Sequence, residues 1–411
     1  MTEGEPRTER NARGRIVLVL DGEQRAALAI VRSLGRAGHT VYVASSVATP
    51  LAGASRYAAK TFRVADGLHQ PEQLAEDVLA LISTHRINML IPVTEPSLLA
   101  LLPRRDALPG VCLPFPDLST FSAICDKEAV LAQAAREGIA VPAQQVVATP
   151  ADAEALDVRT LPYPLVVKPA RSVSGEAQHR AKFMVQYADT PEQLRDLLSG
   201  ADARAYPLLL QQRIVGPGIG LFVLLWNDHV LARFAHRRLR EHPPAGGVSV
   251  YSESVAMDDA LLDRAVRLLR AFRWSGVAMV ECKIDAATGT PYLMEINGRF
   301  WGSLQLAISA GVDFPALLVR AASGESVTPV TTYHVGVRNR WIWGEINHLV
   351  TRLRHSDRAL ALPPGAPSRG TMLRQFFTWS SNDRYETPQR RDLRPFWRET
   401  VQWFSSLLHR S

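Results

Sequence analysis

The sequence contains few cysteines and no long apolar run. Its 411 residues include only three cysteines, whose spacing matches neither a disulfide framework nor a metal-binding motif. The longest apolar runs, such as residues 16–20, are far too short to span a bilayer, and residues 1–15 lack the apolar stretch of a secretory signal. We therefore expect a cytoplasmic protein with a disordered leader at residues 1–14.

Several signatures of catalysis and binding are also missing. No Ser–His–Asp or Cys–His arrangement points to nucleophilic catalysis. No G-x-G-x-x-G follows the first apolar run, so we assign no NAD site. The net charge is +7, with arginines concentrated toward the C-terminus, but no helix-turn-helix, zinc finger or ribonucleoprotein motif accompanies them. We expect no nucleic-acid partner, and the basic balance is compatible with an acidic substrate, an anionic surface or a genome that favours arginine codons.

The first hundred residues show the pattern of a parallel sheet. Hydrophobic residues make up 46% of the chain, which is enough for a substantial core in two or three domains. A strand at residues 16–20, a helix at 24–37 and a strand at 39–44 predict the start of a doubly wound α/β fold. Thr94 and Glu95 end a later strand, where ligands bind in such sheets, although a simple helix N-cap is the alternative interpretation.

A hairpin in the second half of the chain carries candidate metal ligands. Two alternating runs, residues 280–285 and 292–299, flank a turn and predict antiparallel strands that bring Glu281 close to Glu295 and Asn297. Two carboxylates and an amide oxygen are hard ligands that suit Mg²⁺ beside phosphates. Arg299, on the same face, can hold a phosphate or carboxylate bidentately. An amphipathic hairpin with a solvated polar face is the alternative.

Other motifs precede this hairpin in a fixed order. Lys127 interrupts the apolar face of a helix predicted at residues 121–138, and Lys168 ends an apolar strand that leads into a small, polar loop. Ammonium groups and backbone N–H groups of such a loop can neutralise and cradle a polyphosphate. Taken singly, each lysine could simply be solvated. Together with Gly246–Gly247 and the Glu-x-Asn-x-Arg run, they form an ordered set.

This ordered set resembles the ATP-grasp superfamily over roughly residues 15–325, in the carboxylate–amine ligase branch near its carbamoyl-phosphate-synthase-like and D-aspartate-ligase-like members. The resemblance implies an α/β chain with a Rossmann-like pre-ATP-grasp domain at residues 15–118. A two-subdomain α+β ATP-grasp fold is implied at residues 119–325, with subdomains at 119–210 and 211–325. A basic, Trp-rich C-terminal extension, residues 326–411, lies outside the resemblance.

The resemblance also implies roles for individual residues. Glu281, Glu295 and Asn297 match metal ligands, and Arg238 and Arg299 match cations that hold phosphate or an acyl phosphate. The implied ATP contacts come from two lysines, the closing loop and the hinge between the subdomains: Lys127, Lys168, Ser172, Ser174, Gly175, Gln211, Gln212, Arg213 and Ile214. The acidic ribose contact common in the family is missing after the hinge, where Pro217 and Ile219 stand.

The function implied by the resemblance is an ATP-dependent ligase that uses Mg²⁺, with Mn²⁺ as an alternative metal. It would activate a small carboxylate as an acyl phosphate and join it to an amine, releasing ADP and phosphate. A kinase on the same fold remains open, as does a surface-associated binding protein. Residues 341–354 predict a basic amphipathic helix that could contact a membrane surface or pack on its own domain. The C-terminal extension could instead cap the substrate site or form the interface of a homodimer. The acid and the amine stay unidentified.

Overall fold

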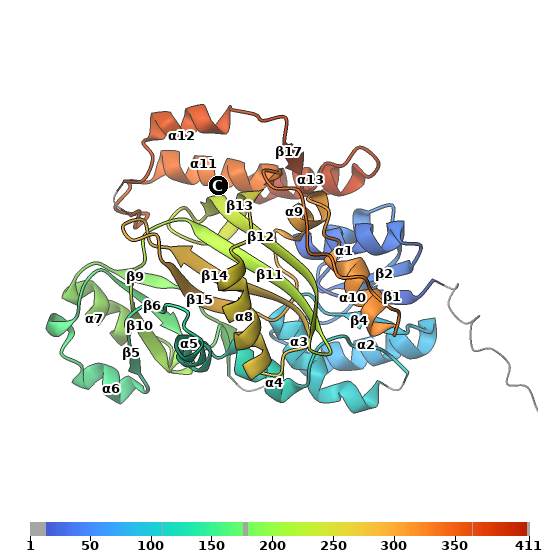
Figure 1. Cartoon of the computed structure of the whole chain (residues 1–411), viewed down its shortest axis with the longest axis horizontal. Helices are drawn as coiled ribbons and strands as arrows, with labels where there is room; N and C mark the ends of the chain where they lie inside the picture. The colour runs from blue at the N-terminus through green and yellow to red at the C-terminus, as the bar shows by residue number, and fades with distance from the viewer. Residues whose placement is uncertain (1–13, 109, 176–179, 364, 409–411) are drawn as a thin grey trace, which may run out of the picture.

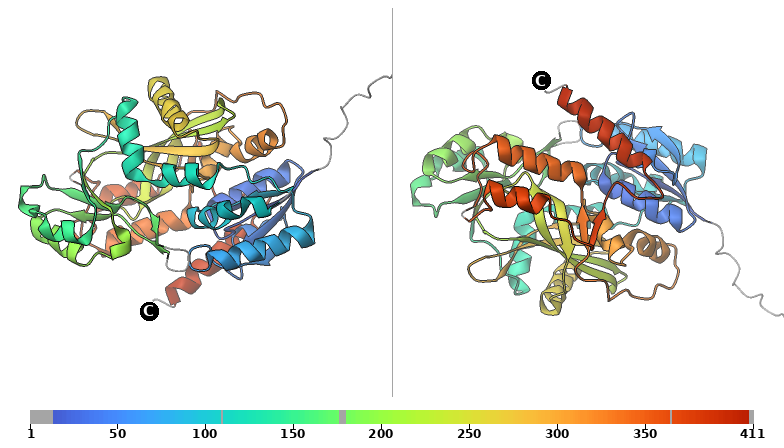
Figure 2. Two further views of the ribbon diagram at one scale, coloured as in Figure 1. Left: turned by 90° about the horizontal axis from the view of Figure 1, so that it is seen from below. Right: turned by 90° about the horizontal axis from the view of Figure 1, so that it is seen from above.

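The computed structural model describes residues 14–108, 110–175, 180–363 and 365–408, so the predicted leader lies, except for Gly14, outside the described residues. The described chain forms an N-terminal parallel sheet, a small antiparallel sheet with a two-stranded pair beside it, a large mixed sheet, and a C-terminal helical segment that lies across them (Figures 1 and 2). This mixed α/β architecture agrees with the predicted fold class.

The N-terminal sheet has the parallel order β3-β2-β1-β4. Its strands are β1 (Ile16–Val19), β2 (Thr40–Ser45), β3 (Ala58–Arg63) and β4 (Met89–Ile91), and its helices are α1 (Arg25–Arg36), α2 (Pro71–His85) and α3 (Glu95–Leu101). β1 and β4 are short, apolar and almost wholly buried, as expected for strands covered on both faces. The strand–helix–strand pattern of the sequence is therefore present.

Two predicted helices are each divided in the structure. Residues 121–138 were expected to form one helix, but α4 (Leu118–Cys125) ends before Asp126, whose side chain accepts a hydrogen bond from the Ala129 N–H and caps α5 (Lys127–Arg136). Lys127 consequently begins a helix. The sequence also predicts one helix over residues 302–318, but α9 (Leu304–Ser309) and α10 (Phe314–Ala322) are separated by a turn at Gly311, where φ is +104°.

A smaller antiparallel sheet, in the order β5-β10-β6-β9, carries Lys168 and the start of the hinge. Its strands are β5 (Gln144–Val147), β6 (Leu165–Pro169), β9 (Gln186–Ala188) and β10 (Leu208–Gln212). The short strands β7 (Val173–Ser174) and β8 (Ala181–Lys182) pair beside it, and the remaining helices of this region are α6 (Pro150–Ala155) and α7 (Pro191–Ser199). Apolar side chains of α7 and of this sheet form their own core.

The seven-stranded sheet has the order β15-β14-β11-β12-β13-β16-β17. Its strands are β11 (Gly218–Trp226), β12 (His229–His242), β13 (Val248–Ser254), β14 (Gly276–Ile284), β15 (Pro291–Asn297), β16 (Arg338–Arg340) and β17 (Asp383–Tyr385). The last two strands come from the C-terminal extension, and β16 pairs with β13. The extension thus continues the large sheet, while the predicted domain boundaries remain predictions.

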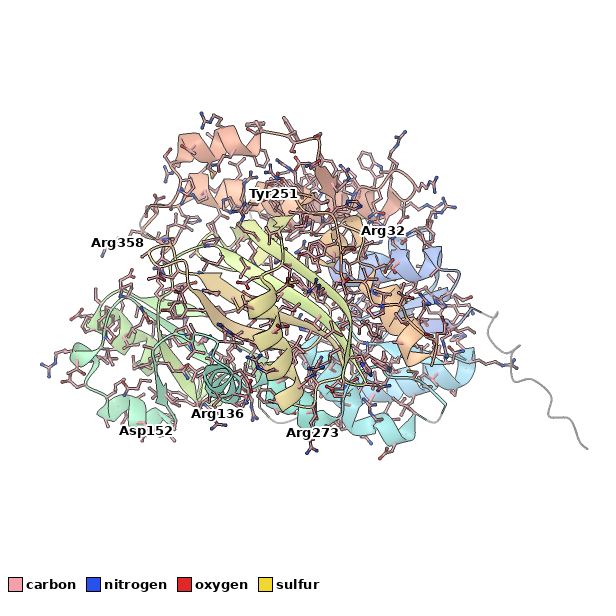
Figure 3. All side chains as sticks on the ribbon, viewed as in Figure 1. Arg32, Arg136, Asp152, Tyr251, Arg273 and Arg358 are labelled. Atoms are coloured by element: carbon pink, nitrogen blue, oxygen red, sulfur yellow. The ribbon has the colours of Figure 1, made fainter. Side chains whose placement is uncertain are left out.

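The rest of the extension is helical and is tied to the N-terminal sheet region. Its helices are α11 (Ile342–Arg354), α12 (Arg369–Phe376) and α13 (Arg394–Leu408). Arg32 of α1 is fully buried, and its guanidinium lies 2.8 Å from the Asp392 carboxylate just before α13 (Figure 3). Trp343 and Trp403 stack with ring centroids 4.4 Å apart and join α11 to α13. None of the helices in the described part of the chain combines the length and the apolar character that a membrane span needs.

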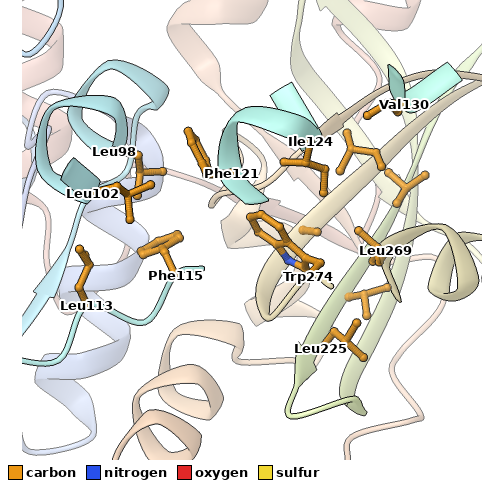
Figure 4. Close-up of a cluster of buried hydrophobic side chains, with 14 of the residues drawn as sticks. Leu98, Leu102, Leu113, Phe115, Phe121, Ile124, Val130, Leu225, Leu269 and Trp274 are labelled. Carbon is orange, nitrogen blue, oxygen red and sulfur yellow. The ribbon is translucent and has the colours of Figure 1, made fainter. Parts of the chain in front are cut away.

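One hydrophobic core joins the N-terminal sheet region to the large sheet. It runs from Leu98 of α3 through Phe121 of α4 and Trp274 to Leu269 of α8 (Asp259–Ala271), as Figure 4 shows. Cys282 is fully buried in this core, on the face of β14 opposite Glu281, in agreement with the alternation in the sequence. This shared core fixes the predicted metal hairpin relative to α4 and α5.

Candidate active site

The hairpin of β14 and β15 places Glu281 directly opposite Glu295. The antiparallel register shifts by one residue next to this pair, so Cys282 faces Leu293 and Met294 has no direct partner. The bulge leaves the Met294 carbonyl oxygen 3.2 Å from the Lys168 Nζ, on the neighbouring small sheet. The predicted hairpin is thus present, and its irregular register connects it to Lys168.

Glu281 forms a buried ion pair with Arg238. The Arg238 Nη2 lies 2.5 Å from the Glu281 Oε2, and its Nη1 lies 2.8 Å from the Glu241 Oε1. Burial raises the pKa of Glu281 above its ordinary value, and the positive charge of Arg238 only partly opposes this effect. Arg238 therefore neutralises one of the two carboxylates predicted to bind metal.

Glu295 is surrounded by cations. Its carboxylate lies 3.6 Å from the Lys127 Nζ and accepts a hydrogen bond of 3.0 Å from the Asn297 amide. Burial raises its pKa, but the charges of Lys127, Lys168 and Arg299 and the hydrogen bond from Asn297 together hold the pKa below the ordinary value. The Asn297 carbonyl oxygen in turn accepts a hydrogen bond of 2.7 Å from Arg299. The structure therefore brings together the predicted ligands, both lysines and Arg299.

Both predicted phosphate-binding lysines are buried. Burial lowers the pKa of Lys168 to about 8, with Glu295 acting in the opposite direction. The Lys127 Nζ donates a hydrogen bond of 2.8 Å to the hydroxyl of Ser172, which begins the predicted closing loop. Ser174 lies in β7, Gly175 has a φ of +104°, and residues 176–179 of the loop are outside the described part of the chain.

The four predicted hinge residues lie farther along, where β10 leads into β11. Gln211 is buried, and its amide donates a hydrogen bond of 2.6 Å to Gln144, whereas Gln212 is exposed. The Arg213 guanidinium stacks over the Tyr187 ring at 4.6 Å and donates a hydrogen bond to the Ala361 carbonyl of the C-terminal extension. Ile214 is buried. Of this group, Arg213 and Ile214 line a cavity.

Two cavities adjoin the predicted ligands. A cavity of about 20 Å³ is lined by Lys127, Ser172, Glu295, Asn297 and Arg299, together with Glu95 and two residues of α4. A second cavity, of about 280 Å³, lies between the hinge segment and the extension. Arg238 contributes to the second cavity and pairs with Glu281, so this cavity reaches the same hairpin.

Glu95 was only a secondary candidate in the sequence. Thr94 caps α3 by accepting a hydrogen bond from the Ser97 N–H, so its side chain has the N-cap role that the sequence left as an alternative. Glu95 lines the small cavity, where burial raises its pKa and Arg299 partly opposes this rise. No local motif marks Glu241 or His348. Lys283 had one signal, since it shares the parity of Glu281 and lines the larger cavity.

The donor set fits a hard divalent cation. Glu281 and Glu295 face each other on paired strands, and Asn297 lies on the same hairpin. Carboxylate and amide oxygens are ligands that Mg²⁺ accepts when phosphate oxygens and waters complete its coordination. Among the described residues there is no group of three or more His, Cys, Asp or Glu placed to hold a metal ion, so the protein alone does not form a full cage. The metal assignment stays a prediction.

Comparisons with known proteins agree with the sequence resemblance. The family model described as "ATP-grasp in the biosynthetic pathway with Ter operon" matches residues 205–344. Vancomycin B-type resistance protein VanB of Enterococcus faecalis is 27% identical over 222 residues, which are 49% of this chain and 62% of VanB. The chain therefore spans about three fifths of the length of this relative.

Solved structures show the fold over a longer part of the chain. L-amino acid ligase from Bacillus licheniformis has a TM-score of 0.59 at 20% identity, covering 78% of this chain and 79% of the ligase. N5-carboxyaminoimidazole synthetase from Staphylococcus aureus has a TM-score of 0.60 at 14% identity, covering 79% and 81%. The chain therefore shares the fold of these ligases, and residues 205–344 within it match the ATP-grasp family model.

Proposed function

We propose that this chain is an ATP-dependent carboxylate–amine ligase. The observation that carries the proposal is the hairpin, where Glu281 and Glu295 face each other while Arg238, Lys127, Lys168 and Arg299 surround them. Two acids and an amide oxygen suit a metal ion, and four cations suit a polyphosphate and a carboxylate. The similarity to VanB and to L-amino acid ligase supports the same activity.

The mechanism follows from where these charges lie. Lys127 and Lys168 hold ATP phosphates against the hairpin, and Mg²⁺ at Glu281, Glu295 and Asn297 would neutralise phosphate charge. Arg299 orients the substrate carboxylate, one oxygen of which attacks the γ-phosphorus in line as the bond to the β-phosphate oxygen breaks and ADP leaves. The amine nitrogen then attacks the acyl carbon, phosphate leaves, and the amine loses a proton. Arg238 and Arg299 stabilise the developing negative charge.

The test is ADP release by the purified chain with Mg-ATP, pooled carboxylic acids and pooled amines. A ligase releases ADP only when an acid and an amine are both present. Release with acid alone would favour the kinase alternative, in which the reaction stops at the phosphorylated product. If neither condition gives ADP release and ATP does not raise the melting temperature, the proposal is wrong. Replacing Mg²⁺ by Mn²⁺ in the same assay tests the alternative metal.

A weak contact between the extension and a membrane surface is a second proposal, and one feature of α13 favours it. Trp397, Val401, Phe404 and Leu407 recur at helical spacing and are all exposed, while exposed arginines precede the helix. α13 also packs on α11, where Trp403 donates a hydrogen bond to Asn347 and the Phe404 ring contacts Trp343. Flotation with vesicles containing anionic lipid, comparing the full chain with its Trp397→Ser, Val401→Ser variant, tests this contact. Equal recovery of both chains would refute it.

Cytoplasmic localisation and a homodimer are also proposals. A free cytoplasmic enzyme would meet ATP and keep its three thiols reduced, and the structure contains no disulfide among its described cysteines. A homodimer predicts a molar mass near twice 45.3 kDa in light scattering. A mass of one chain across the micromolar range would exclude the dimer.

A further inference from the structure

The cavity of about 280 Å³ has two walls that are far apart in the sequence. One wall consists of residues 213–217, which join β10 to β11, together with Gly218 at the start of β11 and the end of β12. The other is formed by α11, α12 and the segment between them, through His348, Arg352, Leu362, Met372 and Gln375. Figure 1 shows α11 and α12 together, with α11 next to the end of β13. The second wall lies beyond residue 344, where the family match ends.

Hydrogen bonds fix the extension to the residues that line the cavity. Arg240 at the end of β12 pairs with Glu345 and donates a hydrogen bond of 3.0 Å to the Gln375 carbonyl oxygen. The His348 Nδ1 lies 2.6 Å from the Glu241 carbonyl oxygen. Arg213 of the hinge donates to the Ala361 carbonyl oxygen. The extension is therefore hydrogen-bonded to residues of the opposite wall of the cavity.

The cavity lies where the base and ribose of a bound nucleotide are expected. Its lining includes Arg213 and Ile214, which belong to the predicted adenine-binding segment, and Arg238, which pairs with Glu281 of the predicted metal site. A nucleotide with its phosphates at Glu281 and Glu295 would therefore place its base and ribose in this cavity. The volume is near the lower limit of small-molecule sites, roughly 300 Å³.

The lining combines apolar and polar groups as a nucleoside site does. Leu362 and Met372 of the extension provide apolar surface, which suits the face of a base. Glu241 offers carboxylate oxygens that can accept hydrogen bonds from sugar hydroxyls. This carboxylate comes from β12, whereas the acidic contact missing from the sequence was expected just after the hinge.

Lys283 provides a hydrogen-bond donor whose ammonium group is not paired with a carboxylate of the described residues. The lining arginines each have a carboxylate within 4 Å: Arg213 with Asp189, Arg238 with Glu241 and Glu281, Arg240 with Glu345, and Arg352 with Asp357. The Lys283 ammonium lies 3.5 Å from the Ile214 carbonyl oxygen. Within the described residues, no carboxylate lies within 4 Å of its Nζ, so the ammonium can donate to a ligand oxygen.

We propose that the C-terminal extension forms the outer wall of the nucleoside part of the nucleotide site. Met372 and Gln375 of α12 face the base, and Lys283 and Glu241 face the ribose. This inference rests on the proposed use of ATP. It gives the extension a direct part in nucleotide binding and selection, through residues outside the family match. The occupant is a nucleoside diphosphate or triphosphate, and the carboxylic acid substrate is the competing occupant that the experiment must distinguish.

The test introduces a large side chain at the edge of the cavity. Gln375 is exposed, so Gln375→Trp adds an indole beside the cavity without burying a new polar group. Thr378→Trp is the matched control, because Thr378 is also exposed and close in sequence but does not line the cavity. Both variants are first checked for unchanged melting temperature. Calorimetry then measures the Kd of ADP with Mg²⁺, and we expect Gln375→Trp to raise this Kd at least about tenfold and Thr378→Trp to leave it unchanged.

The outcomes separate this inference from the proposed function. If the wild-type chain binds ADP and Gln375→Trp binds it equally well, the extension does not form the nucleoside wall, although the ligase proposal stands. If Gln375→Trp raises only the KM of the acid, the cavity belongs to the acid and the inference is overturned. If the wild-type chain binds no nucleotide, the proposed function itself fails. Lys283→Met is the second variant, and an unchanged ADP Kd would remove the assigned role of its ammonium.

Discussion

Arg238 of β12 and Glu281 of β14 form a buried ion pair across the intervening strand β11. Their polar atoms are 2.5 Å apart, and Arg238 also pairs with Glu241 at 2.8 Å. In this structure Arg238 pairs with the Glu281 carboxylate, which the sequence predicts to be a metal ligand. Metal and phosphate binding would therefore redistribute the partners of Arg238, which becomes available to phosphate when Glu281 binds a cation.

The first prediction concerns Glu281→Gln. The amide removes the negative charge that would hold Mg²⁺, so we expect the half-saturating Mg²⁺ concentration for ADP release to rise at least about tenfold. The control is Glu253→Gln, which disrupts a comparable pair with Arg237, 2.8 Å away on the same sheet. A magnesium titration of all three chains provides the measurement. The same shift in both variants would mean that the effect comes from the sheet and not from the metal site.

The second prediction concerns pH. Burial lowers the pKa of Lys168 from 10.5 to about 8, so its ammonium charge is lost as the pH rises through this value in the nucleotide-free chain. If phosphate binding requires this charge, the Kd of ADP should rise about tenfold from pH 7 to pH 9. Lys168→Arg keeps the charge over this range and should give a nearly constant Kd. A matching rise in Lys168→Arg would assign the pH dependence to another group.

The third prediction concerns the attachment of the extension. Arg32 is fully buried and bonds to Asp392 and to the carbonyl oxygens of Glu386 and Thr387. Arg32→Ala leaves Asp392 buried without this partner, so we expect a loss of about 3–5 kcal/mol in the free energy of unfolding. Arg36→Ala, on the exposed end of the same helix, should change it by less than about 0.5 kcal/mol. Urea denaturation tests both values, and similar losses in the two variants would contradict the prediction.

The fourth prediction concerns two glycines with opposite surroundings. A Cβ at Gly298 would lie 2.4 Å from the Trp274 ring, so Gly298→Ala should cost about 1–3 kcal/mol and displace the flanking Asn297 and Arg299. ADP release by the Gly298→Ala chain should also fall, because Asn297 and Arg299 are displaced. A Cβ at Gly370, within α12, meets nothing within 4 Å, and Gly370→Ala should stabilise the chain by roughly 0.5–1 kcal/mol. Thermal unfolding distinguishes the two, and a stable, fully active Gly298→Ala chain would refute the first half.

Much of the fold could be predicted because the relevant signals are local. The apolar run of β1, the periodicity of α1 and the alternation of β14 and β15 follow from the physical requirement to bury apolar side chains. The break at Asp126 was missed because an interrupted apolar face does not by itself end a helix, and the boundary is decided by the capping hydrogen bond that Asp126 accepts from the Ala129 N–H. The turn at Gly311 was missed in the same way.

The sequence by itself determined the type of fold, the paired carboxylates and the order of lysines, loop and hairpin, because strand alternation and residue chemistry are local properties. Tertiary structure alone decided that Arg238 pairs with Glu281, that Glu95 lines the site, and that the extension adds two strands to the large sheet. Tertiary structure also placed Met372 and Gln375 in the lining of the cavity between the hinge segment and the extension. These relationships join residues far apart in the chain. They depend on how sheets and helices pack, which no local pattern encodes.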